Sequence, residues 1–136
     1  MGCGYSVYST SGDIIFKHRG PKKGARKVIK MFEKENGLLF RLEMNGGQWA
    51  FYNDTKEYEF YVQYVFEDGS EVEPLGDATL TEMEDGTTIV ETTVYPLETQ
   101  MFLSGDITGG HGRIEARPLS ERYRREKLKI KIARGS

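Results

Sequence analysis

Residues 57–66 carry large apolar side chains at every second position, and no other stretch constrains the fold as strongly. Successive side chains of a β-strand point to opposite faces, so a period of two indicates a strand with one buried face. Two further segments show this pattern around a turn sequence: 38–54 around Asn45-Gly46-Gly47, and 78–95 around Asp85-Gly86. Each is predicted to be a β-hairpin, because such turn pairs join antiparallel strands tightly.

The other segments predict further short strands and no helix. With roughly eight to ten strands separated by turn signals, the predicted fold class is all-β: an antiparallel two-sheet β-sandwich, jelly-roll-like. The expected strands include 13–16 near the start of the chain. They also include 128–132, where Leu128, Ile130 and Ile132 alternate with lysines as in a charged edge strand. Residues 109–112 are predicted to be a turn.

The expected domain organisation is simple. A chain of 136 residues can form one domain with a sizeable core. Residues 1–12 are rich in glycine and serine and are expected to form a flexible, acylated tether. Residues 13–133 are expected to form a single β-sandwich domain, and 134–136 resemble the start of a vector-derived tail.

The first six residues, MGCGYS, match the acceptor pattern for N-terminal myristoylation. Gly2 would carry the myristoyl chain after removal of Met1, and Ser6 completes the motif. Cys3, the only cysteine of the chain, is a candidate for S-palmitoylation beside it. Because one myristoyl chain gives only marginal binding, with K about 10⁴ M⁻¹, a second chain would explain stable attachment. The alternative is an ordinary tail that matches a short pattern by chance.

Charge is strongly segregated along the chain. Residues 33–106 hold 17 acids and three bases, whereas the two ends hold 16 bases and four acids. The segment 17–30 contains no acid, and glycine and proline interrupt it, which favours a basic loop. This loop could contact an anionic leaflet, and the candidate residues are Lys17, Arg19, Lys22, Lys23, Arg26 and Lys27. Two alternatives remain open: a solvated loop, or neutralisation by pairing between the basic ends and the acidic middle.

The cellular compartment follows from what the chain lacks. No segment approaches the ~20 apolar residues of a membrane-spanning helix, and no apolar signal region stands near the start. One cysteine cannot form an internal disulfide, which agrees with a reducing, cytosolic environment. Myristoylation also occurs on the cytosolic side, so we expect a cytoplasmic-face location.

Four sequence blocks resemble a known family: NGLLFRL (36–42), QWAFYND (48–54), EPLG (73–76) and YPLET (95–99). Together they resemble the calpain-related proteins of kinetoplastid parasites. The resemblance implies a β-sandwich, acylation at Gly2 and Cys3, and residence on the cytoplasmic face of the flagellar membrane. It does not imply protease activity, because the shared blocks belong to a non-catalytic module and a cysteine protease needs a Cys–His pair.

Other sites are less well supported by the sequence. Two distant histidines and one cysteine give no metal-ligand spacing, so no metal, cofactor or catalytic residue is predicted. The acidic residues at 67–77 could hold calcium, although a solvated loop is the simpler interpretation. An apolar cleft between the sheets could be lined by Trp49, Phe51, Tyr58 and Phe60.

The sequence therefore predicts a non-enzymatic, dually acylated peripheral membrane protein that presents a β-sandwich as a binding or scaffold module. Two alternatives remain: a regulatory peptide- or protein-binding module of calpain-related complexes, and a module that binds lipid or an acyl chain in a cleft. The expected partner is the membrane's inner leaflet, with a protein partner also possible. No nucleic-acid partner is expected, because the centre of the chain is acidic, and we expect a monomer.

Overall fold

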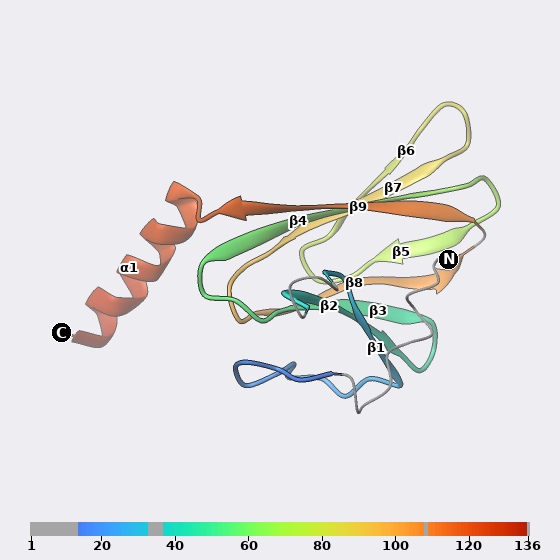
Figure 1. Cartoon of the computed structure of the whole chain (residues 1–136). Coiled ribbons are helices and arrows are strands. Elements are labelled where there is room, and N and C mark those ends of the chain that lie inside the picture. The colour runs from blue at the N-terminus through green and yellow to red at the C-terminus, as the bar shows by residue number, and fades with distance from the viewer. Residues whose placement is uncertain (1–13, 33–36, 108, 136) are drawn as a thin grey trace.

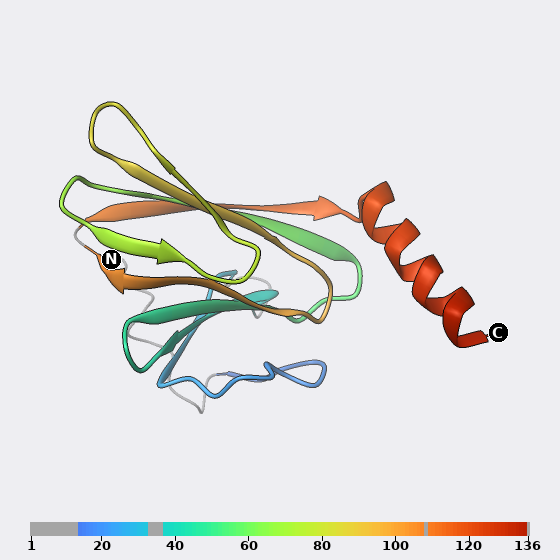
Figure 2. The ribbon, with the colours of Figure 1, turned by 180° about the vertical axis from the view of Figure 1, so that it is seen from behind.

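The computed structural model describes residues 14–32, 37–107 and 109–135. Two antiparallel sheets pack face to face, as Figures 1 and 2 show from opposite sides. Sheet A has five strands and sheet B has four, which confirms the predicted all-β sandwich. In chain order the strands are β1 (Lys27–Lys30), β2 (Leu39–Met44), β3 (Gln48–Asn53), β4 (Tyr58–Phe66), β5 (Glu71–Pro74), β6 (Thr79–Glu82), β7 (Thr88–Val94), β8 (Thr99–Asp106) and β9 (Gly110–Pro118).

The strand order is β1-β2-β3-β8-β5 in sheet A and β6-β7-β4-β9 in sheet B. The two predicted hairpins are present, because β2 pairs with β3 and β6 pairs with β7, both antiparallel. After β3 the chain passes between the sheets repeatedly, so strands distant in sequence become neighbours, such as β3 and β8. These crossings enclose one core between the sheets.

From Phe60 onward, the even-numbered side chains of β4 face the core between the sheets, as the alternation predicted. Phe60, Val62 and Phe66 are at most 1% exposed. Opposite them, sheet A contributes Phe51 and Phe102, whose rings meet edge to face with centroids 5.2 Å apart. Burial of these large apolar side chains is the main source of stability for the sandwich.

The prediction of a C-terminal edge strand is wrong: the segment forms α1 (Glu121–Gly135). Ser120 caps this helix, because its Oγ accepts a hydrogen bond from the N–H of Tyr123 at 3.1 Å. Glu121 and Arg125 then form an i,i+4 ion pair, and the first turns are rich in strong helix formers. The alternation at 128–132 lacks a neighbouring strand to pair with, since α1 leaves the sheet after Pro118 (Figure 1).

Two smaller predictions also differ from the structure. Residues 14–16 are irregular and not a strand, because Phe16 packs sideways onto sheet A without ladder pairing. The predicted turn at 109–112 largely belongs to β9, which begins at Gly110. The long partner strand β4 explains this difference, since its far end, Phe66, pairs with Gly110.

The close pairing of β5 and β8 depends on Gly105. A Cβ at this position would lie 1.9 Å from the carbonyl oxygen of Glu71, and the glycine has φ of +143°. Gly105→Ala is therefore expected to destabilise the domain by about 2 kcal/mol or more, through backbone strain and displacement of β5. Urea unfolding measures the change. Gly24→Ala is the control, because nothing lies within 4 Å of its Cβ and it should be neutral or slightly stabilising.

Candidate functional site

The two strands β2 and β3 are apolar on both faces. Their outward-facing side chains, Phe40, Leu42, Ala50 and Tyr52, are at most 1% exposed. A second apolar cluster covers them, formed by Ile14, Phe16, Ala25, Val28, Met44 and Met101. Residues 14–26 therefore form a third layer over the outer face of sheet A, here called the N-terminal layer. In Figures 1 and 2 it is the blue segment beneath β2 and β3.

Asp54, just after β3, fixes the start of the N-terminal layer. Its carboxylate accepts hydrogen bonds from the backbone N–H groups of Lys17 at 2.6 Å and His18 at 3.1 Å. The hydroxyl of Tyr52 donates to the same carboxylate at 2.9 Å and accepts from the N–H of Gly20 at 3.0 Å. Asp54 is only 3% exposed, so these bonds are shielded from water.

The remainder of the N-terminal layer is held by its backbone and by one ring. The N–H of Lys22 donates to Oγ1 of Thr99 at 2.9 Å, and that of Arg26 to the carbonyl of Glu43 at 2.9 Å. Phe16 packs edge to face on Phe40, with ring centroids 4.9 Å apart. The segment is thus ordered through its main chain, which leaves its charged side chains available.

Five of the six predicted membrane-contact residues are exposed on this layer: Lys17, Arg19, Lys22, Lys23 and Arg26. Ile15 lies among them and is 65% exposed. Within the described residues none of these five bases takes part in an ion pair. The structure therefore places a cationic surface with one exposed apolar side chain on the outside of sheet A.

The alternative of neutralisation between the basic ends and the acidic middle is seen only as neighbouring ladder positions, such as Lys27 opposite Glu43 and Arg117 opposite Glu59. Lys27, the sixth candidate, is half-buried in β1 and stands opposite Glu43 in the ladder. In β9, Arg113 and Arg117 both pair with Glu115 of their own strand. Within the described residues, therefore, no ion pair joins a base of the two ends to an acid of 33–106, because Glu43 pairs with Arg41 and Glu115 belongs to the C-terminal end.

Burial, followed by the hydrogen bond to Asp54, raises the pKa of the Tyr52 hydroxyl from 10.0 to about 12. A raised folded-state pKa means that the protonated phenol stabilises the fold fully below pH 10 and loses this effect as the pH rises towards about 12. We expect tyrosinate absorbance of the native protein to show a late step near this pH. Tyr52→Phe should diminish this step, to which the raised pKa values of Tyr61 and Tyr95 also contribute. A late step of unchanged amplitude in Tyr52→Phe contradicts the assignment.

The four residues predicted to line a cleft have different environments. Phe51 and Phe60 are fully buried core residues, whereas Tyr58 is 41% exposed. Trp49 is half-buried, and the guanidinium of Arg41 lies over its ring at 4.2 Å. Arg41 also donates to the hydroxyl of Tyr64 at 3.0 Å, which places a charge at the margin of the core. A cleft at these positions would require the core to open, and it stays a prediction.

A small cavity of about 230 Å³ lies elsewhere, lined by Met31, Phe32, Tyr64, Gly112 and Ile114. Ligand pockets usually measure ~300–1,000 Å³. The cavity is therefore small for a whole acyl chain.

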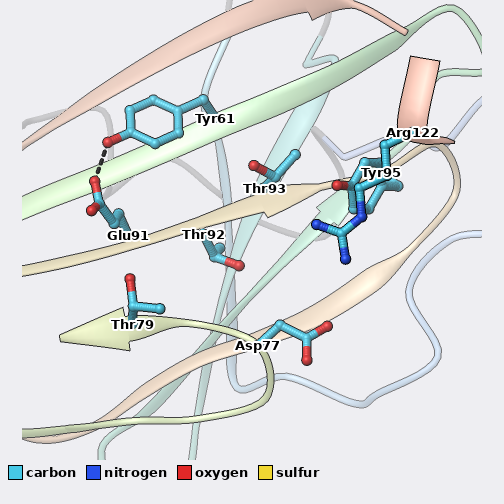
Figure 3. Close-up of a pocket in the computed structure, with 8 residues that line it drawn as sticks. All are labelled: Tyr61, Asp77, Thr79, Glu91, Thr92, Thr93, Tyr95 and Arg122. Atoms are coloured by element: carbon cyan, nitrogen blue, oxygen red, sulfur yellow. Dashed lines mark hydrogen bonds between the residues drawn. The ribbon is translucent and has the colours of Figure 1, made fainter. Parts of the chain in front are cut away.

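A larger, polar cavity of about 470 Å³ lies on the outer face of sheet B. Figure 3 shows its lining residues: Tyr61, Asp77, Thr79, Glu91, Thr92, Thr93, Tyr95 and Arg122. The hydroxyl of Tyr61 donates to the carboxylate of Glu91, and this hydrogen bond with burial raises the Tyr61 pKa, burial being the larger cause. β6 pairs with β7 only as far as Glu91, so the cavity lies beside a stretch of β7 with no strand partner on that side. Sequence patterns gave no indication of it.

The part of the chain that the structure describes contains neither a metal centre nor a membrane-spanning helix. No group of three or more histidine, cysteine, aspartate or glutamate side chains is placed to hold a metal ion there. Nor is any helix among residues 14–32, 37–107 and 109–135 long and apolar enough to cross a membrane. Gly2, Cys3 and Ser6, the predicted acylation residues, lie outside the described residues.

The fold and this layer define a small all-β sandwich protein with a polycationic outer surface. The chain belongs to the family described as Domain of unknown function (DUF1935), which matches residues 16–119. That range includes the N-terminal layer from Phe16 onward and ends before α1.

Two solved structures resemble the chain. The NMR structure of SMP-1 (Small Myristoylated Protein) from Leishmania major is 38% identical, with a TM-score of 0.83, covering 96% of this chain and 98% of that one. A Leishmania major hypothetical protein is also 38% identical, with a TM-score of 0.71, covering 80% of this chain and 97% of that one. No curated protein sequence matches. The predicted relation to a kinetoplastid protein is confirmed, whereas the relation to calpains stays a prediction.

Sequence reasoning found the basic residues of the site but missed what holds them. Asp54 and Tyr52 lie in the recognised block 48–54, yet nothing in that block indicates that they bind the backbone at 17–20. One signal was available: apolar residues run almost without interruption through 38–42, which is typical of a strand buried on both faces.

Proposed function

We propose that this protein is a peripheral membrane protein, myristoylated on Gly2, that holds its β-sandwich against the cytoplasmic face of a membrane. The observation that carries the proposal is the likeness to SMP-1, described as a small myristoylated protein, over 96% of this chain. The MGCGYS start supplies the acceptor glycine, with Ser6 at the required spacing. Cys3 is the proposed site of a second, palmitoyl chain.

The N-terminal layer is the proposed electrostatic contact. Its described part begins at Ile14, so fewer than 13 residues separate it from an acyl chain on Gly2. At ~3.3–3.6 Å per extended residue, the layer lies within about 45 Å of the bilayer anchor. Each base near an anionic leaflet contributes about 1 kcal/mol, and the five exposed bases form no ion pair with any other described residue.

With the N-terminal layer against the membrane, the opposite face of the sandwich stays accessible. The polar cavity of sheet B lies on the side away from the N-terminal layer, where it would face the cytoplasm. We assign the protein no enzymatic role and give the sandwich the role of a binding or scaffold module. The flagellar membrane is its proposed location, which fluorescence microscopy of the tagged protein in a flagellated cell would check.

Mass spectrometry of the N-terminal peptide, isolated from the native organism's cells, tests the proposal. We expect the mass of a myristoyl group on Gly2, and that of a thioester-linked palmitoyl group on Cys3 that hydroxylamine removes. An unmodified Gly2 would contradict the proposed function. A modified Gly2 with a free Cys3 thiol would leave single acylation with the basic layer as the second attachment.

A further inference from the structure

The helix α1 is strongly basic and lies almost free of the sandwich. Its fifteen residues include seven lysines and arginines against two glutamates. It contacts the sandwich at its first turn, where Tyr123 stacks on Tyr95 with centroids 5.4 Å apart. The N–H of Ser120 also donates to Oε1 of Glu59 at 2.7 Å. Beyond that turn it projects from the body (Figures 1 and 2).

This helix is poorly stabilised by its own sequence. Isolated helices of ~12–15 residues are marginal in water. Besides the opposite-charge spacings Glu121–Arg125 and Arg122–Glu126, bases repeat at i,i+4 at 125 and 129 and at 127 and 131, and such like-charge pairs are destabilising. Arg124, Arg125 and Lys127 are exposed, as is Leu128 at 55%. A surface of negative charge would relieve this repulsion and stabilise the helix.

Two turns at the opposite end of the sandwich carry exposed acids, whereas Glu59 and Asp77 lie beside the first turn of α1. No lysine or arginine occurs between residues 57 and 112. The β4–β5 turn and the β6–β7 turn both carry exposed acids, and Asp68 of the first lies against Gly86 of the second. Figures 1 and 2 place α1 and the loop of the N-terminal layer towards one end of the sandwich, and these acidic turns towards the other.

We propose that α1 is a second contact with anionic phospholipid, independent of the N-terminal layer, and that it gains helicity there. The proposal rests on the proposed membrane attachment, which brings α1 to the bilayer. The charge asymmetry favours one orientation, with α1 and the N-terminal layer towards the anionic surface and the acidic turns away from it. Together the two basic elements fix the tilt of the sandwich on the membrane.

Vesicle sedimentation of the full chain without acyl groups tests this inference separately from the lipid anchor. The vesicles contain phosphatidylserine in phosphatidylcholine, or phosphatidylcholine alone. Each base near an anionic leaflet strengthens binding about five-fold, so Arg124→Gln with Arg125→Gln should weaken binding to the anionic vesicles about 25- to 30-fold. The charge-matched control, Arg113→Gln with Arg117→Gln on sheet B, should change it less than two-fold. Circular dichroism should show more helix with anionic vesicles only.

Three results would overturn the inference. The first is unchanged anionic-vesicle binding of the α1 variant while Lys22→Gln with Lys23→Gln loses it, which leaves the N-terminal layer as the sole contact. The second is a salt-sensitive dimer without vesicles that the α1 variant abolishes, which assigns α1 to the acidic end of a second copy. The third is no binding of the unacylated chain to anionic vesicles. None of these depends on whether Gly2 is myristoylated, so the proposed function can stand or fail separately.

Discussion

Gly2→Ala is expected to move the protein from the membrane pellet to the soluble fraction almost completely. Alanine carries a side chain that the acyltransferase does not accept, so no myristoyl chain is attached. Each buried methylene of such a chain contributes about 0.8 kcal/mol, so the substitution removes the main source of membrane affinity. Fractionation of cells that express each variant, followed by immunoblotting, measures the distribution.

Two further variants define the result. Gly4→Ala changes the same residue type at a position the motif leaves open, and the protein should stay in the pellet. Cys3→Ser should give an intermediate distribution, because one myristoyl chain binds only with K about 10⁴ M⁻¹ and the basic surfaces add to it. If Gly2→Ala and Gly4→Ala fractionate alike, the acyl chain is not the anchor.

The sandwich was predictable from the sequence because strands with one wet face alternate, as 58–66 and 78–95 do. β2 and β3 are buried on both faces, and the turn at 45–47 marked them as a hairpin. The pairing of β3 with β8 was not predictable, since it joins residues about 50 positions apart through packing alone. Strand order therefore came from the structure.

The period-two pattern at 128–132 wrongly predicted a strand, because no neighbouring strand is available there. Leu128, Ile130 and Ile132 alternate with lysines, but a strand needs a neighbour and α1 has none. The Ser120 cap and the Glu121–Arg125 pair are local helix signals that precede this pattern in the chain. They prevail because no sheet edge competes for the same backbone groups.

The sequence predicted the charged residues of the candidate site but not the structure that holds them. Lys17, Arg19, Lys22, Lys23 and Arg26 could be identified from charge alone, and the structure places all five on one exposed layer. The sequence could not show that this layer is ordered, or that main-chain hydrogen bonds hold it. Such bonds leave no trace in the sequence of the segment they hold, because any residue except proline supplies the N–H.

Asp54→Ala is accordingly expected to release the N-terminal layer and to lower the free energy of unfolding by about 3 kcal/mol. Hydrogen bonds to a charged group contribute roughly 1.5–3 kcal/mol each, and three donors share this buried carboxylate. The layer's release would also expose the apolar outer face of β2 and β3, including Phe40 and Leu42, to water. Urea unfolding and amide exchange at Lys17 and His18 measure the two effects.

Two comparisons separate this role from a general loss of charge. Asp85→Ala removes an exposed carboxylate that also accepts a backbone N–H, that of Thr87, so it should have a distinctly smaller effect. Asp54→Asn keeps one acceptor oxygen and should be intermediate. If Asp54→Ala leaves the Lys17 and His18 amides protected, Asp54 does not hold the layer. If they exchange freely while vesicle binding stays unchanged, the basic residues bind without a preformed surface, and the order of the layer has no part in membrane recognition.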